Sequence, residues 1–273
     1  MNILYKFLIL FSLILLISCA KEKKEISKIT ELDQELEMII TYETAMVSLK
    51  KRDYYFASKK FLETELLFPQ SEWAPKSALM SAYSNYMNNF YSEAVFDLTR
   101  YMSTYPKDKN MLYAHYLMAM CYYENIEDEK KDLAPLVKAK NKFEFILKEY
   151  PETDFALDAS FKIDLINDIM ASKEMYIGRH YIKREKWVAA INRFKVVTED
   201  YQTTIYVEEA IHRLVEIYYR IGLIDESKKY ANLLGYNYLS SDWYRKSYKI
   251  FDQDIKTPKI KIEKNSLLKK FKK

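Results

Sequence analysis

A spacing of small, apolar and aromatic residues recurs four times along the chain. Each copy has an alanine, a large apolar residue four positions later, and an aromatic residue followed by Pro or Gln at positions eleven and twelve. The copies are Ala57/Phe61/Phe68-Pro69, Ala94/Leu98/Tyr105-Pro106, Ala139/Phe143/Tyr150-Pro151 and Ala190/Phe194/Tyr201-Gln202. The alanine lets two helices approach, the large residue fills the space beside it, and proline cannot continue a helix. The pattern is typical of the second helix of a helix-turn-helix repeat, so we predict an all-α solenoid.

The first helix of these repeats is predicted by a second small residue. Twelve positions before the alanine lie Ala45, Ala82 and Gly178 in three of the four copies. Apolar residues recur around them at the i, i+3, i+4 and i+7 spacing of one helix face, which must be buried.

A fifth, weaker copy is predicted from the turn between the two helices. The residue five positions before the alanine is Arg52, Asn89 or Glu185 in three of the copies. Gly222 holds the same position before a further small residue, Ser227. We therefore expect about five tetratricopeptide-like repeats.

Two departures from the repeat length predict insertions. Ala139 lies 45 residues after Ala94, whereas the preceding step is 37 residues. We assign the excess to a charged loop over residues 124–131, between the two helices of the third repeat. A second excess, of 14 residues, follows Pro151. Apolar residues over 155–169 predict an additional helix there, between repeats three and four.

The N-terminus has the composition of a lipoprotein signal. Lys6 is followed by an uncharged apolar run of 11 residues, 7–17, which is short for a membrane span and typical of a signal-peptide core. The sequence LISC at residues 16–19 resembles a bacterial lipobox, in which the cysteine carries diacylglycerol and an N-acyl chain. We therefore expect covalent lipid on Cys19, and Ala20 after it favours the outer membrane by analogy with lipoprotein sorting. An ordinary signal peptide, with the cysteine incidental, is the alternative.

These signals divide the chain into four parts. We expect a signal peptide over 1–18, a lipidated tether over 19–33, the repeat domain over 34–252 and a disordered Lys-rich tail over 253–273. The stretch from Lys256 to Lys273 holds eight Lys and one Glu, a net charge of +7. The tail is either a solvated segment or a contact for anionic lipid headgroups or an acidic partner.

Composition and motifs argue against catalysis. Only 3 residues are Gly and 49% are hydrophobic, which allows a sizeable core and disfavours β-hairpins. None of the three His is expected to belong to an i, i+4 zinc-binding pair. The sequence contains no Gly-rich phosphate loop and no Gly-x-Ser-x-Gly turn. We expect a protein that is not an enzyme, with no cofactor beyond the lipid, no metal, no nucleic-acid partner, and Cys121 buried in the core.

Several longer strings of residues carry a resemblance to one family. They are 173–181 (KEMYIGRHY), 189–195 (AAINRFK), 201–204 (YQTT), 207–210 (VEEA), 234–237 (LGYN) and 243–244 (WY). With the lipobox and the repeats, they resemble the BamD family, lipoproteins of the outer-membrane β-barrel assembly machine. The likeness extends over nearly all of the chain after Cys19, up to about Phe251.

The resemblance implies a scaffold on the periplasmic face of the outer membrane. Its C-terminal half would dock on the last periplasmic domain of a BamA-like barrel subunit. Its N-terminal repeats would receive C-terminal segments of unfolded β-barrel outer-membrane proteins. The Lys-rich tail and the short loop of the third repeat depart from the family, which leaves contacts with accessory Bam lipoproteins open.

The N-terminal repeats carry the predicted groove for substrate segments. Tyr and Met side chains can hold an apolar segment at low ordering cost, because rings have few rotamers and Met adapts its shape. The candidates are Tyr42, Met46, Tyr83, Tyr86, Tyr116, Met120 and Tyr123. The alternative is that they form the buried stripe of the first helices, with two or three left exposed.

The predicted docking surface for the barrel subunit lies in the additional helix and the fourth repeat. Charged and amide residues within the family strings are Lys173, Glu174, Arg179, Asn192 and Arg193. The planar fork of an Arg can pair with a partner's carboxylate through two hydrogen bonds. The alternative is a salt bridge between Arg193 and Glu174 within the solenoid.

The lipobox and the repeats are also compatible with a different function. Another periplasmic repeat lipoprotein, such as an adaptor for peptidoglycan hydrolases or for pilus secretins, would share the lipobox and the repeats. It would lack the strings that resemble the BamD family.

Overall fold

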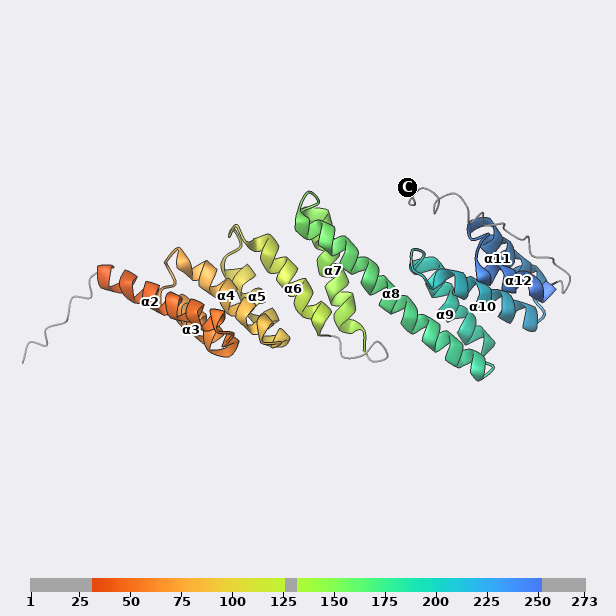
Figure 1. Cartoon of the computed structure of the whole chain (residues 1–273), viewed down its shortest axis with the longest axis horizontal. Coiled ribbons are helices and arrows are strands. Elements are labelled where there is room, and N and C mark those ends of the chain that lie inside the picture. Colours follow the sequence, from red (N-terminus) through yellow and green to blue (C-terminus); the bar gives the residue numbers. More distant parts are fainter. Residues whose placement is uncertain (1–30, 126–131, 252–273) are drawn as a thin grey trace, which may run out of the picture.

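The predicted solenoid is confirmed. The computed structural model describes residues 31–125 and 132–251, with side chains from residue 35 onward. Every regular element in these ranges is a helix, and consecutive helices stack into one elongated array (Figure 1). The helices are α2 (Glu31–Lys50), α3 (Tyr54–Leu67), α4 (Trp73–Met87), α5 (Tyr91–Thr104), α6 (Met111–Glu124), α7 (Ala134–Glu149), α8 (Asp154–Lys183), α9 (Trp187–Asp200), α10 (Val207–Arg220), α11 (Ile224–Asn237) and α12 (Asp242–Phe251).

The small residues of the repeat lie at the helix crossings, as the spacing predicts. The alanines and the serine of the second helices are fully buried, as are the alanines of the first helices. At Gly178 in α8 an added Cβ would come within 2.7 Å of the ring of Phe194 in α9. That separation is shorter than carbon atoms tolerate, so no larger residue fits without moving the ring.

The turn residues confirm the register of the repeats, including the fifth. Arg52, Asn89, Glu185 and Gly222 adopt φ angles of 63°, 59°, 56° and 84°. This left-handed conformation ends one helix and redirects the chain into the next. The second helices then end at corresponding aromatic residues, which are Phe68, Tyr105, Tyr150, Tyr201 and Tyr238.

The prediction of a separate additional helix over residues 155–169 is wrong. Residues 155–169 continue into the first helix of the fourth repeat, and together they form the 30-residue helix α8. No Pro interrupts the sequence between Asp154 and Lys183, so nothing ends the helix there. The charged insertion of the third repeat lies between α6 and α7, and its residues 126–131 are outside the described residues.

The apolar core differs along the array. Three clusters follow one another in the N-terminal half: between α2 and α3, among α4, α5 and α6, and among α6, α7 and the first part of α8. One larger cluster joins the second part of α8 to α9, α10 and α11, with rings of α12 against it. The boundary between the last two clusters falls within α8, between Ile166 and Ala171.

Four predictions concern residues outside the described ranges. These are the signal peptide over 1–18, the lipid on Cys19, the tether as far as residue 30 and the tail after Phe251. None of the described helices is both long and apolar enough to cross a membrane. Cys121 is fully buried in α6, as expected, and burial raises the pKa of its thiol to about 12.

Candidate functional site

The seven candidate groove residues lie in three different clusters. Tyr42 is buried in the first cluster, and Met46 packs against the same cluster. Tyr83 and Tyr86 pack against the second cluster, and Tyr116, Met120 and Tyr123 pack against the third. The last six are half-buried and none of the seven is fully exposed, so the expectation that two or three stand exposed is wrong. The physical reason is that each ring also covers the joint between its own repeat and the next one.

Specific contacts hold two of these rings. The hydroxyl of Tyr116 donates to Asp158 Oδ2 in α8 at 2.7 Å, and its ring lies 4.9 Å from that of Phe155. The ring of Tyr42 makes an edge contact with Trp73 at 4.7 Å. These rings therefore stabilise the joints between repeats and present only part of their surface to solvent.

The docking candidates include two ion pairs within the solenoid. Arg193 in α9 donates from Nη1 to Glu174 Oε2 in α8 at 3.0 Å. Arg179 in α8 donates through Nε and Nη2 to the carboxylate of Glu209 in α10, at 3.0 and 2.6 Å. The alternative stated for Arg193 and Glu174 is therefore confirmed. Both Arg side chains remain 41% exposed, whereas the two carboxylates are largely buried.

The five docking candidates do not form one surface. Glu174 and Arg179 are five residues apart on α8, which turns them about 140° around the helix. The pair with Arg193 thus lies on one flank of the contact between α8 and α9, and the pair with Glu209 lies on the other. Asn192 is exposed on α9, and Lys173 is half-buried on α8.

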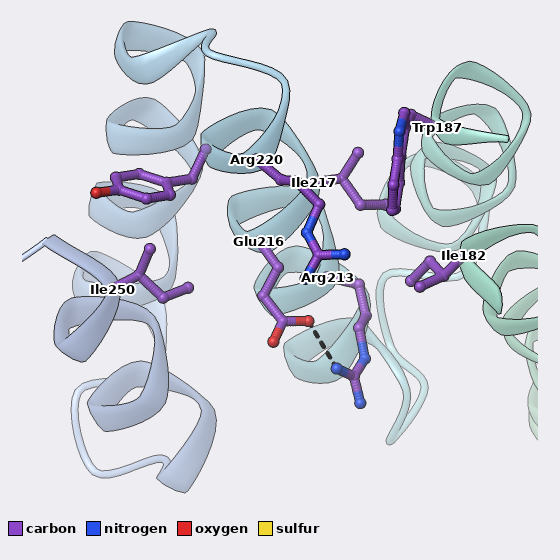
Figure 2. Close-up of a pocket in the computed structure, with 8 residues that line it drawn as sticks. Ile182, Trp187, Arg213, Glu216, Ile217, Arg220 and Ile250 are labelled. Carbon is purple, nitrogen blue, oxygen red and sulfur yellow. Dashed lines mark hydrogen bonds and ion pairs between the residues drawn. The ribbon is translucent and has the colours of Figure 1, made fainter. Parts of the chain in front are cut away.

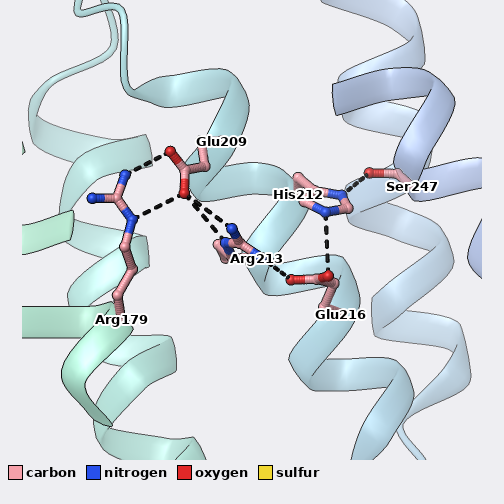
Figure 3. A network of polar contacts seen from close by, with 6 residues as sticks. All are labelled: Arg179, Glu209, His212, Arg213, Glu216 and Ser247. Atoms are coloured by element: carbon pink, nitrogen blue, oxygen red, sulfur yellow. Dashed lines mark hydrogen bonds and ion pairs between the residues drawn. The ribbon is translucent and has the colours of Figure 1, made fainter. Parts of the chain in front are cut away.

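A polar relay across the C-terminal half was not predicted (Figure 3). Arg213 in α10 donates to Glu209 Oε1 at 3.3 Å and to Glu216 Oε2 at 2.6 Å. Glu216 Oε1 also lies 3.3 Å from His212 Nε2, and the other ring nitrogen of this His is 2.8 Å from Ser247 Oγ in α12. Together with Arg179, the relay joins α8, α10 and α12.

Part of this relay is visible in the sequence. Glu209 and Arg213 are four residues apart, and so are His212 and Glu216. Such pairs share one helix face. The pair of His212 and Glu216 belongs to the relay, so it does not contradict the expectation that no His forms an i, i+4 zinc-binding pair. The described residues contain no group of three His, Cys, Asp or Glu that could hold a metal ion.

The relay keeps its carboxylates ionised. Burial opposes ionisation, but hydrogen bonds from Arg179 and Arg213 hold the pKa of Glu209 below its ordinary value. Burial likewise opposes ionisation of Glu216, yet hydrogen bonds from His212 and Arg213 lower its pKa to about 2. Both groups are negatively charged at neutral pH, so the relay is a structural ion-pair network.

A cleft of about 600 Å³ opens beside the relay, where α8, α9, α10 and α12 converge (Figure 2). Its lining combines apolar side chains with Arg213, Glu216 and Arg220. The guanidinium of Arg220 lies 5.2 Å from the centre of the Trp187 ring. The cleft therefore offers an apolar surface beside two guanidinium groups.

Comparison with known proteins decides the family. A family model described as an outer membrane lipoprotein matches residues 34–234. The outer membrane protein assembly factor BamD of Caulobacter vibrioides is 40% identical over 242 residues, covering 89% of this chain and 78% of that protein. BamD of Rickettsia prowazekii is 42% identical over 209 residues, covering 77% of this chain and 83% of that protein. The chain belongs to the BamD family.

More distant BamD proteins match over a similar length. BamD of Neisseria meningitidis serogroup A is 28% identical over 227 residues, covering 80% of this chain and 85% of that protein. All of these relatives are named as assembly factors of outer membrane proteins. The family resemblance stated from the sequence is thereby confirmed, and with it an outer-membrane association.

Proposed function

We propose that this BamD-family protein is a periplasmic scaffold of the β-barrel assembly machine, held at the outer membrane by lipid on Cys19. The C-terminal half would bind a BamA-like barrel subunit, and the N-terminal repeats would receive C-terminal segments of unfolded β-barrel proteins. The proposal assigns no enzymatic activity to the chain. Its support is the family membership together with the arrangement of the C-terminal half.

The observation that carries the proposal is the exposure of Arg193. Nη1 of Arg193 donates to the carboxylate of Glu174, and a guanidinium has five N–H donors in all. With 41% of its side chain exposed, Arg193 has donors left for a partner's carboxylate. Glu174 fixes its position, so little side-chain entropy is lost on binding.

The test uses charge reversal with a matched control. Arg193→Glu should strongly weaken capture of a BamA-like barrel subunit by the purified protein, because a reversed charge at a desolvated contact repels its partner. Arg245→Glu is the control, since Arg245 in α12 is also 41% exposed and also pairs with a nearby carboxylate. Equal loss with both variants, at unchanged helix content, would remove the assignment of Arg193.

The lipid anchor has a separate test. Cys19→Ser should leave the repeats folded and move the protein from the membrane fraction to the soluble fraction, in cells that lack the barrel subunit. Two or more acyl chains hold a protein on a membrane firmly, and no described helix replaces them. Continued sedimentation of the Ser variant with membranes would contradict the anchor.

The accessory subunits are part of the same test. Affinity purification from membranes should recover the barrel subunit and accessory Bam lipoproteins. Recovery of peptidoglycan hydrolases or of a pilus secretin, without the barrel subunit, would favour the alternative adaptor function.

A further inference from the structure

The first part of α8 carries an uncovered apolar stripe. Leu157, Phe161 and Leu165 are 62%, 61% and 48% exposed. They are spaced four residues apart, so they lie along one face of the helix. Other large apolar residues of the array are exposed too, but these three form a continuous line at the middle of the molecule.

The stripe is uncovered because the two parts of α8 bury different faces. The first part packs Ala156, Ala159 and Ile166 on the cluster with α7. The second part packs Ala171 and Met175 on the cluster with α9. With 14 residues, α9 is about 21 Å long and covers only half of α8, which is about 45 Å long. Figure 1 shows the first part of α8 extending past α9.

The surroundings of the stripe are acidic. Residues 154–170 contain four Asp and one Lys, a net charge of −3. Asp158 accepts a hydrogen bond from Tyr116. Asp154, Asp164 and Asp168 make no ion pair with any residue that the structure describes. An occupant of this surface must therefore combine apolar and cationic side chains.

The chain itself contains a segment of that kind. Residues 252–273 lie outside the described residues, and they contain eight Lys and three acidic residues, a net charge of +5, together with apolar residues such as Leu267, Leu268 and Phe271. The 17 residues from 252 to 268 can extend by roughly 55 Å. This reach exceeds the combined width of three packed helices, roughly 30 Å, and the length of α8.

We propose that residues 252–273 dock on the stripe of α8, with apolar residues against Leu157, Phe161 and Leu165 and with Lys beside Asp154, Asp164 and Asp168. A tethered segment meets its site at an effective concentration in the millimolar range. A contact with a dissociation constant of about 1 mM between separate molecules is then about half occupied within one chain. The tail thus covers the stripe in the isolated protein and leaves it when a stronger partner binds there.

This inference does not depend on the proposed function, because its test uses the purified protein alone. The probe is a cysteine at Phe161, labelled with a neutral maleimide in the mature chain carrying Cys19→Ser. Cys121, the other cysteine of that chain, is fully buried with a pKa raised to about 12, so it does not compete. The labelling rate is compared with that of the same variant ending at Phe251.

Removal of the tail should raise the labelling rate of Phe161→Cys by about twofold or more. The control is Val188→Cys, which is 70% exposed on α9 in a basic stretch and should label equally with and without the tail. Asp164→Asn with Asp168→Asn should abolish the protection of Phe161→Cys. About 0.5 M salt should do the same, because it shortens electrostatic screening to about 4 Å.

Two results would overturn the inference. Equal rates at Phe161→Cys with and without the tail would show that the segment leaves the stripe open. Protection that grows with protein concentration would show that a second copy, rather than the chain's own tail, covers it.

Discussion

The two halves of the solenoid are stabilised in different ways. The C-terminal half has one continuous apolar core and a polar relay that joins three of its helices. The N-terminal half has three smaller cores, and most of its candidate groove rings are half-buried at the joints between repeats. In a repeat protein each repeat contacts only its neighbours, so separate cores let the joints adjust, whereas a shared core resists local opening. A rigid platform suits a single permanent partner, and adjustable joints suit segments of varied sequence.

The N-terminal half also has a buried ion pair, but its geometry is different. Glu65 in α3 accepts hydrogen bonds from Arg100 in α5 at 2.5 Å and from the hydroxyl of Tyr105, the residue after α5, at 3.1 Å. Beside it, Asp97 in α5 accepts hydrogen bonds from Ser81 and Asn85 in α4, and Ser81 also donates to the carbonyl of Ser58 in α3. These contacts join the three neighbouring helices α3, α4 and α5. The C-terminal relay continues through Glu209 and Glu216 to Ser247, so it couples α8, α10 and α12 by side chains alone.

The largest expected effect tests the core of the C-terminal half. Gly178→Leu should lower the free energy of unfolding by about 2 kcal/mol, because overpacking at the crossing of α8 and α9 displaces Phe194. Thermal unfolding measures the change. Asn192→Leu, at an exposed position of α9, is the control and should leave the midpoint nearly unchanged. An unchanged midpoint for Gly178→Leu would contradict the close contact between Gly178 and Phe194.

A second prediction compares the two halves in acid. The folded-state pKa values of Glu209 and Glu216 are lowered, that of Glu216 from 4.5 to about 2. A carboxyl group whose pKa is lowered by folding stabilises the protein at pH values above its pKa in the unfolded state. This stability is lost as the pH falls through its pKa in the folded state. The C-terminal half should therefore lose stability progressively between about pH 5 and pH 2.

The N-terminal half should respond less to the same change. Burial raises the pKa of Asp97, which makes protonation in acid favourable to the folded state. Asp108 acts in the opposite direction, because hydrogen bonds from Tyr101 and Asn110 outweigh its burial and lower its pKa. The contributions of Asp97 and Asp108 to stability in acid therefore oppose each other.

Tryptophan fluorescence separates the halves. Trp73→Phe leaves reporters only in the C-terminal half, whereas Trp187→Phe with Trp243→Phe leaves a reporter only in the N-terminal half. Glu216→Gln should reduce the acid sensitivity of the C-terminal signal. If the N-terminal signal were lost first on acidification, the comparison between the halves would be wrong.

The smallest expected effect concerns the turns, which are alike in both halves. Gly222 has a φ of 84° and open space around its Cα, so Gly222→Ala should cost about 1 kcal/mol through backbone strain alone. Glu185→Gly removes such strain and should raise the free energy of unfolding by up to about 1 kcal/mol. Part of this gain is offset because Gly makes the unfolded chain more flexible. Chemical denaturation measures both. A stabilising Gly222→Ala would contradict the left-handed turn.

The repeat register was predictable because its requirements are local. A crossing of two helices needs a small residue, and a fixed number of positions later the helix must end, so Ala57, Ala94 and Ala190 mark the register in the sequence alone. The turn residues follow from the same count. The unbroken helix α8 was also visible in principle, since no Pro separates its two apolar stretches.

The candidate sites were less predictable because they depend on how helices cross. Arg179 meets Glu209, 30 residues away, only because α8 lies beside α10. The spacing of the seven Tyr and Met candidates in the N-terminal repeats fits a groove and a buried stripe equally well, and only packing shows that six of the seven side chains are half-buried. Exposure and ion pairing are properties of the assembled array, so single positions in the sequence do not determine them.

One experiment tests most directly whether the C-terminal half binds the barrel subunit and the N-terminal repeats bind substrate segments. Arg193→Glu, and a second variant with Tyr83→Ala and Tyr116→Ala, are each assayed for capture of the barrel subunit and for crosslinking to C-terminal peptides of β-barrel proteins. Helix content and unfolding midpoint are measured for both, because Tyr116 also holds Asp158. The Arg variant should lose the subunit and keep the peptide, and the Tyr variant should do the opposite. An Arg variant that loses the peptide and keeps the subunit would reverse the assignment of the two halves.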